Sequence, residues 1–312
     1  MSPEERQAKL ILEHVDHEEE TYSDGQDIEE EITRIVSSEE KAEAIKNKLE
    51  ADPSWAVLAH LSPERENLLS WYPFRKDASL LEAGAGFGAL TGLFCRRVKK
   101  VTAIELTGKR AEATAARHGE FANLTVIAGS LARISLKEKF DYVAAIGVLE
   151  YAGRYEESSD PFLGFLKTLR SSLAEGGTLI LAIENRFGLK YWAGAREDHT
   201  GRLAESIEGY PHQKATQTFS KGEIRDLLEN AGFKRMEFYY PLPDYKFALE
   251  IFSDSYLPTI NHNVRTGIYP YPDLCRPREF FFDEKLVNDS LVKEGKFGFF
   301  ANSFLIFARA KQ

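Results

Sequence analysis

The chain has few cysteines, no long apolar run and no excess of basic residues. Its 312 residues include two cysteines, Cys95 and Cys275, which are too few for a disulfide framework and fit a reducing compartment. No run approaches the roughly 18 apolar residues of a transmembrane helix, and the opening MSPEERQAKL lacks a signal-peptide core. We therefore expect a cytoplasmic protein without membrane insertion.

The balance of charge argues against nucleic acid as a partner. The net charge is −9 and the sequence pI is about 5.5, whereas a nucleic-acid footprint needs a basic face. A hydrophobic content of 43% and a charged content of 29% are ordinary for a globular protein long enough to bury a sizeable core. The sequence gives no prediction of oligomeric state.

A glycine-rich motif is the most informative segment. Residues 80–92, LLEAGAGFGALTG, predict a buried strand that ends in a carboxylate, then a tight turn and a helix start. A phosphate cradle would avoid the negative charge of Glu82, two residues before Gly84. That charge suits a cofactor with a positively charged end, such as S-adenosylmethionine (SAM), which carries a sulfonium and an ammonium group.

Two alternatives fit the same turn. Gly84 to Ala89 also satisfies the dinucleotide fingerprint G-x-G-x-x-G/A, with Glu105 about 20 residues further on to bind a ribose hydroxyl. A glycine turn without any ligand is the simpler alternative. Dinucleotide folds repeat the mononucleotide-binding half, and only one such half is visible here, which favours SAM.

From residue 79 the chain alternates strand and helix, which is typical of an α/β fold with a mostly parallel sheet. The expected strands are SLLEAG, KVTAIEL, LTVIAG, FDYVAAIG and TLILAIEN, with MEFYYPLPDY and SFLIFARA as a closing antiparallel pair. Together they predict a Rossmann-like sheet with an antiparallel last strand. A helix is expected over 162–173, and a capping box at Ser220 to Glu223 begins another.

The expected domain organisation is an N-terminal helical arm and lid over 1–78 and a SAM-binding domain over 79–312. Within the arm we expect a frayed helix or mobile segment over 1–21. After it we expect a helix with an apolar face over Ile28 to Val36. We expect a second helix with a capping box at Ser37 and Glu40, and a third that begins at Ser62-Pro63. Acceptor-side insertions are expected at about 186–217 and 246–302, the second without a predicted fold.

Strand ends carry the candidate cofactor-binding residues, because ligands of open α/β sheets bind at the carboxyl ends of strands. Glu82 would face the methionine end of SAM and Glu105 the ribose hydroxyls, although Glu105 could instead serve a helix cap. Ser130 and Leu131 are candidates for adenine contact. The full candidate set is Glu82, Gly84, Ala85, Gly86, Gly88, Glu105, Leu106, Ser130, Leu131, Gly147 and Val148.

The chain resembles class I SAM-dependent methyltransferases across residues 79–240, through EAGAGFG, AIEL, FDYV, GVLEY and LAEGGTLILAIEN. More narrowly, LSPERENLLSWYPF, AIENRFGLKYWAGAREDHTG and TFSKGEIRDLLENAGF resemble a bacterial group associated with glycosyltransferases and polysaccharide biosynthesis. Ser130 departs from the broad class, many of whose members carry an acid at this position, which weakens the adenine assignment.

The resemblance implies a SAM-dependent methyltransferase, with O-methylation of a sugar hydroxyl on a glycan or glycan precursor as the leading activity. Esterification of a peptide or small-molecule carboxylate is the alternative chemistry. A SAM-binding accessory subunit without turnover is the alternative of another class.

A hydroxyl acceptor needs a general base, and His199 beside Asp198 is the first choice because histidine titrates near neutrality. A loop histidine that only holds backbone is the alternative. Glu150 and Tyr151, after the fourth strand, could line the acceptor pocket or be surface residues. No metal is expected, because Asp198, His199 and His212 have no recognised ligand spacing.

Further candidates for acceptor binding lie around this histidine. Two arginines could hold an anionic acceptor, or form surface ion pairs of little energetic value. The aromatic candidates could stack on a sugar ring or peptide, or simply pack in the core. The acceptor set is Tyr22, Tyr191, Trp192, Arg196, Arg202 and His212.

Overall fold

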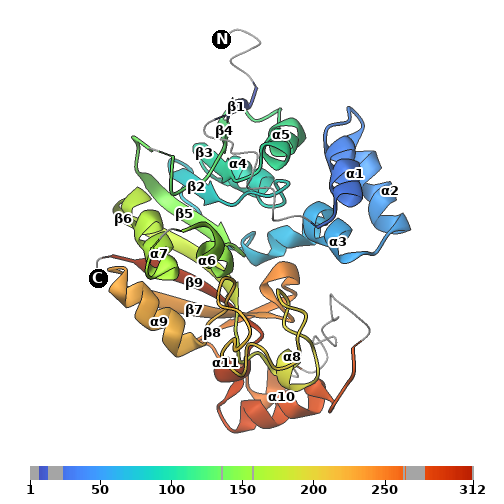
Figure 1. Ribbon diagram of the computed structural model, residues 1–312, viewed down its shortest axis with the longest axis vertical. Helices are drawn as coiled ribbons and strands as arrows, with labels where there is room; N and C mark the ends of the chain where they lie inside the picture. The colour runs from blue at the N-terminus through green and yellow to red at the C-terminus, as the bar shows by residue number, and fades with distance from the viewer. Residues whose placement is uncertain are drawn as a thin grey trace. The chain divides into compact units, whose positions relative to one another are not determined.

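The computed structural model describes residues 7–12, 24–134, 136–156, 158–262, 264 and 278–310 (Figure 1). The chain divides into two units. Unit 1 comprises Met1–Ala144 and Ser171–Gly177, and unit 2 comprises Ala145–Arg170 and Thr178–Gln312. None of the helices within the described residues is long and apolar enough to cross a membrane.

Unit 1 contains the parallel part of the fold. Its strands, in spatial order, are β1 (Lys9–Leu12), β4 (Leu124–Ala128), β3 (Lys100–Glu105), β2 (Ser79–Ala83) and β5 (Phe140–Ile146), the last two residues of β5 belonging to unit 2. β1, β4, β3 and β2 pair in parallel, with Leu81 opposite Thr102 and Ala103 opposite Val126. β2, β3 and β4 are almost wholly buried, as expected for parallel strands covered on both faces.

The helices of unit 1 are α1 (Gln26–Val36), α2 (Lys41–Ala51), α3 (Trp55–Leu61), α4 (Thr91–Arg97) and α5 (Gly108–Arg117), with the 3-10 helix η2 at Pro63–Leu68. α1 buries Ile32, Ile35 and Val36 against Phe87 of the glycine motif, which confirms the predicted apolar face. The α1–α3 helices therefore contact the glycine turn through side chains.

Two predictions for the N-terminal region need correction, and a third is confirmed. Residues 9–12 form β1, an exposed edge strand paired with β4, rather than a frayed helix, because the edge of β4 offers unpaired backbone groups. α2 begins after Glu40 without a side-chain cap, so the capping box at Ser37 is wrong. The helix predicted to begin at Ser62-Pro63 is confirmed: it is η2, and Ser62 caps it by accepting from Glu64 N.

Unit 2 contains the antiparallel strands. In spatial order they are β6 (Leu173–Glu184), β9 (Ser303–Arg309), β7 (Arg235–Leu242) and β8 (Glu250–Ser253), with the first five residues of β6 belonging to unit 1. β9 runs antiparallel to β6 and β7, pairing Leu181 with Ile306 and Phe238 with Ile306. The predicted α/β class with an antiparallel last strand is confirmed.

The remaining helices are α6 (Ala152–Tyr155), α7 (Pro161–Ser172), α8 (Leu189–Trp192), α9 (Lys221–Asn230), α10 (Glu284–Lys293) and α11 (Phe297–Phe300), with 3-10 helices η3 (Leu149–Tyr151), η4 (Tyr245–Phe247) and η5 (Ile260–His262). α7 matches the helix predicted over 162–173. The capping box of Ser220 and Glu223 is present at the start of α9, as predicted. Within 246–302, where the sequence predicts no fold, the described residues form β8, η4, η5, α10 and α11.

Candidate active site

The glycine turn between β2 and α4 leaves open space beside one residue. Gly86 has φ +57°, and a side chain built on it would meet nothing within 4 Å. Its amide donates to Glu105 Oε2 at 2.8 Å, which holds the turn against the end of β3. A left-handed glycine with open space beside it is what a turn needs if its backbone is to approach a ligand closely.

Gly88, two residues later, is closed by packing. At φ +75° a Cβ here would lie 2.9 Å from the imidazole of His118. His118 Nε2 donates to the Gly88 carbonyl at 2.8 Å, and the ring is buried. Burial lowers the pKa of His118 to about 4, because the apolar surroundings disfavour its charged form. His118 therefore supports the turn as a neutral side chain.

Stability should fall on acidification because of this histidine. Its pKa is lower folded than unfolded, so between pH 6.5 and 4 only the unfolded chain binds the proton. The stability that His118 contributes is present above pH 6.5 and is lost as the pH falls toward 4. Both proteins should become less stable between pH 7 and 4.5. We expect the drop in the free energy of unfolding to be roughly 2 kcal/mol smaller for a His118→Gln variant than for the wild type. Urea unfolding at both pH values measures this, and parallel losses in the two proteins would contradict it.

Two carboxylates flank the turn at the ends of β2 and β3. Glu82 is 5% exposed and accepts from Thr91 Oγ1 at 2.6 Å. Burial raises the pKa of Glu82 to about 8, and the nearby charge of Glu105 adds to this. Glu105 accepts from Thr107 N at 3.1 Å as well as from Gly86, so it serves both the start of α5 and the glycine turn. A positively charged ligand group would stabilise the ionised form of Glu82.

The other cofactor candidates follow the ends of neighbouring strands. In unit 1, Ala85 and Leu131 are buried and Leu106 is half-buried, while the Ser130 carbonyl accepts from Arg133 N and Ile134 N in the turn after β4. In unit 2, Val148 is half-buried, and a Cβ on Gly147 (φ +72°) would lie 2.6 Å from Tyr245 Oη. Gly147 is thus required by packing, whatever it binds.

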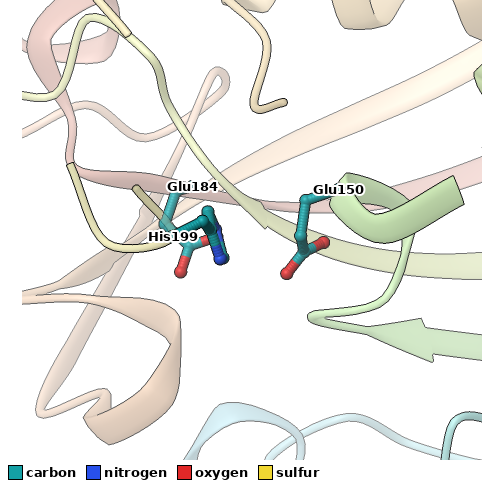
Figure 2. A group of neighbouring side chains, drawn as sticks. All are labelled: Glu150, Glu184 and His199. Atoms are coloured by element: carbon teal, nitrogen blue, oxygen red, sulfur yellow. The ribbon is translucent and has the colours of Figure 1, made fainter. Parts of the chain in front are cut away.

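Three side chains in unit 2 converge on one small volume (Figure 2). They are Glu150 in η3, Glu184 at the end of β6, and His199 in the loop after α8. One ligand atom from each lies within 4.8 Å of the other two. The residues Glu150 and Glu184 are 1% and 0% exposed, and the side chain of His199 is 7% exposed. Unit 2 therefore holds a buried group of two carboxylates and an imidazole, which we name the acidic trio.

One polar atom of each trio member makes no hydrogen bond. These atoms are Glu150 Oε2, Glu184 Oε2 and His199 Nε2, and Nε2 lies 3.7 Å from the Glu184 oxygen. The other imidazole nitrogen, Nδ1, lies 3.1 Å from Tyr151 Oη, so the tyrosine fixes the ring. Each trio member thus keeps one buried polar atom without a hydrogen bond, and the pair of His199 and Glu184 is held only by the attraction between their charges.

Burial and mutual charge shift the pKa of each trio member. Burial, with the charge of Glu184, raises the pKa of Glu150 to about 8. Burial also disfavours charge on Glu184, but Lys246 and His199 hold its pKa well below the usual range. The Glu184 carboxylate outweighs burial at His199 and raises the pKa of its imidazole to about 9. Of the two carboxyls, Glu184 is therefore the one that ionises readily.

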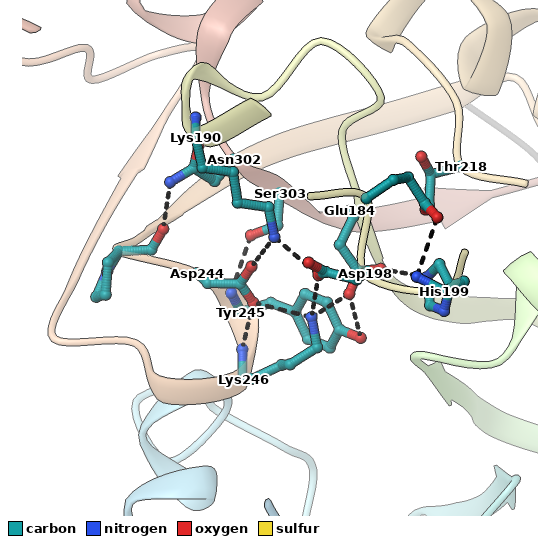
Figure 3. A network of polar contacts seen from close by, with 12 residues as sticks. Glu184, Lys190, Asp198, His199, Thr218, Asp244, Tyr245, Lys246, Asn302 and Ser303 are labelled. Carbon is teal, nitrogen blue, oxygen red and sulfur yellow. Dashed lines mark hydrogen bonds and ion pairs between the residues drawn. The ribbon is translucent and has the colours of Figure 1, made fainter. Parts of the chain in front are cut away.

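A network of lysines and aspartates adjoins the trio (Figure 3). Lys246 Nζ contacts the second oxygen of Glu184, and it lies 3.3 Å from Asp198 Oδ2 and 3.6 Å from Asp244 Oδ1. Lys190, fully buried, lies 2.8 Å from Asp198 and 3.3 Å from Asp244. The carboxylate that pairs with the His199 imidazole is consequently Glu184, whereas the sequence neighbour Asp198 pairs with lysines.

The acceptor candidates are dispersed. Tyr191 is buried, Trp192 and Arg202 are exposed, and Arg196 Nη1 donates to the Gly201 carbonyl at 3.1 Å. His212 pairs with Glu205 at 2.7 Å. Tyr22 lies outside the described residues. Among the catalytic candidates, the structure brings Glu150, Tyr151 and His199 together.

Sequence reasoning missed Glu184, Lys190, Asp244 and Lys246. Glu184 ends the predicted strand TLILAIEN, so the rule that selected Glu82 would also have selected it. Lys190 lies 54 residues before Asp244 and meets Asp244 and Lys246 only in the fold.

The chain is similar to known methyltransferases. A family model described as a methyltransferase domain matches residues 57–237. The ribosomal RNA small subunit methyltransferase A of Syntrophus aciditrophicus is 33% identical over 73 residues, 23% of this chain and only 24% of that protein. Nodulation protein S of Bradyrhizobium diazoefficiens is 24% identical over 148 residues, 46% of this chain and 69% of that protein.

Among solved structures, a SAM-dependent methyltransferase of Thermotoga maritima, described as a possible histamine N-methyltransferase, aligns with 90% of this chain and 100% of its own. The sequence identity is 18% and the TM-score 0.46. Nodulation protein S of Bradyrhizobium japonicum, described as an N-methyltransferase, aligns with 55% of this chain and 83% of its own, at 16% identity and TM-score 0.41.

Proposed function

We propose, on the premise that the chain belongs to the methyltransferase domain family and uses SAM, that it methylates a hydroxyl oxygen. The family match covers β2 to β6, the Rossmann-like methyltransferase core expected from the sequence. The observation that carries the choice of acceptor is the acidic trio, with three buried polar atoms in unit 2 that make no hydrogen bond. The acceptor itself is our proposal.

Unit 1 would hold the cofactor. SAM, when bound, supplies an electrophilic methyl group on a sulfonium. Gly86 offers open space beside a left-handed backbone, and Glu82 offers a carboxylate for a positively charged group. Glu105 would bind ribose hydroxyls while its bond to the Gly86 amide holds the turn. The residues present therefore fit SAM, and Ser130 and Leu131 are the proposed adenine neighbours.

Unit 2 would serve the acceptor. In its neutral form, which becomes more abundant as the pH rises toward its pKa of about 9, His199 Nε2 takes the hydroxyl proton as the new O–CH₃ bond forms and the S–CH₃ bond breaks. Tyr151 and Glu184 fix the imidazole, and Glu150 accepts a hydrogen bond from the acceptor. Alignment and exclusion of water supply most of the acceleration in such a transfer, up to about 7–11 kcal/mol in favourable cases. The general base adds roughly 10²–10⁴ in rate.

The charge of the trio favours a hydroxyl over a carboxylate acceptor. The ionised Glu184 carboxylate would repel an anionic acceptor. Of the two arginines proposed for an anion, Arg196 donates to a backbone carbonyl and Arg202 is exposed. Sugar hydroxyls, by contrast, donate readily to carboxylates. Together with the resemblance to the glycosyltransferase-associated group, this supports a sugar hydroxyl of a glycan or glycan precursor.

Transfer of labelled methyl from SAM into a panel of acceptors tests the proposal. The panel should hold nucleotide sugars and oligosaccharides, carboxylate-bearing peptides, and amines, with product analysis by mass spectrometry. We expect O-methylated sugars. Label in the carboxylates or amines alone would contradict the hydroxyl assignment, and SAM binding without any transfer would favour an accessory subunit.

A further inference from the structure

The geometry of the acidic trio is that of a set of metal ligands. Ligands at about 2.0–2.2 Å from one ion lie about 3–4 Å apart. His199 Nε2 and Glu184 Oε2 are 3.7 Å apart, and the three ligand atoms lie within 4.8 Å of one another. A shift of less than about 1 Å would bring all three onto one ion.

Each member of the trio also has one unsatisfied polar atom. Glu150 Oε2, Glu184 Oε2 and His199 Nε2 are buried and make no hydrogen bond within the part of the chain that the structure describes. Buried polar atoms of this kind are costly unless something pairs with them. Since each atom can donate an electron pair, a cation satisfies all three at once.

The opposite ends of two of these side chains are already fixed. His199 Nδ1 is held by Tyr151 Oη at 3.1 Å, while Glu184 Oε1 contacts Lys246 and lies 3.4 Å from Tyr245 Oη. Metal-binding histidines and carboxylates usually have such outer partners, which orient the ligand atom. Lys246 approaches the oxygen that faces away from the trio, and it shares its charge with Asp198 and Asp244.

We propose that Glu150, Glu184 and His199 bind a divalent metal ion. Two carboxylates and one imidazole suit Mn²⁺, which accepts both oxygen and nitrogen ligands, and they leave positions open for water or an acceptor oxygen. The sequence gives no hint of this, because the ligands belong to η3, β6 and a loop rather than to one motif. With an ion bound, His199 would serve as a ligand instead of the general base, and the ion would lower the pKa of the acceptor hydroxyl, whose proton would pass to solvent.

The catalytic role of the ion rests on the proposed function. The binding of the ion can be measured without any acceptor. The probe is Mn²⁺, titrated into chelator-treated full-length protein and followed by electron paramagnetic resonance of the free ion. We expect one Mn²⁺ per chain. Glu150→Gln should weaken binding at least about tenfold. Glu284→Gln is the matched control, since Glu284 is also buried in unit 2 but pairs with Arg278.

SAM binding by each variant shows that the chain is folded. Absence of Mn²⁺ binding by wild-type protein that binds SAM would overturn the metal site, and so would equal Mn²⁺ affinity in Glu150→Gln and Glu284→Gln. Undiminished sugar methylation in the presence of chelator would remove the ion's catalytic role while leaving the methyltransferase intact. Mn²⁺ binding without methylation of any hydroxyl would instead contradict the proposed acceptor.

Discussion

Replacing His199 with alanine should lower methyl transfer at saturating acceptor by about 10²–10⁴-fold. The side chain is buried, its Nε2 faces Glu150 and Glu184, and Tyr151 fixes its Nδ1. The loss is expected whether the imidazole takes the acceptor proton itself or holds a cation that activates the hydroxyl. Steady-state rates with labelled SAM measure it, and SAM affinity should be unchanged because the cofactor residues of unit 1 are untouched.

Two further variants make this result specific. Tyr151→Phe keeps the imidazole but removes its hydrogen bond, so it should reduce turnover less than the loss of His199 does. His262→Ala removes an exposed histidine that bonds only to Tyr256 and Thr259 among the contacts described, and its turnover should equal that of the wild type. Unchanged turnover in His199→Ala would exclude this residue from the reaction.

The fold was largely predictable because its signals are local. Continuous apolar runs bounded by glycine or charge mark β2 to β6, and Ser220 with Glu223 marks the start of α9. β1 was not predictable, since the four residues KLIL become a strand only by pairing with the edge of β4. The secondary structure of residues 246–302 could not be predicted for a related reason. The short elements described there are defined by tertiary packing rather than by a repeating apolar pattern.

The two parts of the site differ in the same way. The cofactor candidates lie within a few residues of predicted strand ends, so their places could be inferred from spacing alone. The acidic trio draws on η3, β6 and the loop after α8, and its lysines come from α8 and η4. The sequence indicated Glu150 and His199 as separate candidates and did not predict that they lie together. It assigned His199 the adjacent carboxylate of Asp198, which the fold turns toward Lys190 and Lys246 instead.

Substituting Gly86 with alanine should weaken SAM binding by about 100-fold, or about 2.7 kcal/mol. The residue is left-handed at φ +57° and the space beside it is empty of protein atoms within 4 Å. An added methyl group would therefore project into the space proposed for the cofactor. It would also strain the amide that donates to Glu105 Oε2. Isothermal titration with SAM measures the affinity directly.

The matched control is Gly176→Ala. Gly176 has φ +75° and likewise nothing within 4 Å of an added Cβ, so both substitutions carry the same kind of backbone strain, about 1–3 kcal/mol of stability. Of these two glycines, Gly86 alone lies in the glycine turn between β2 and α4, which Glu82 and Glu105 flank. Urea unfolding should therefore give similar losses for the two variants, while SAM affinity falls in Gly86→Ala alone. If both variants bound SAM as the wild type does, the open space beside Gly86 would have another purpose. If Gly86→Ala loses stability but keeps its affinity for SAM, the glycine is needed for the backbone conformation and not for the approach of the ligand.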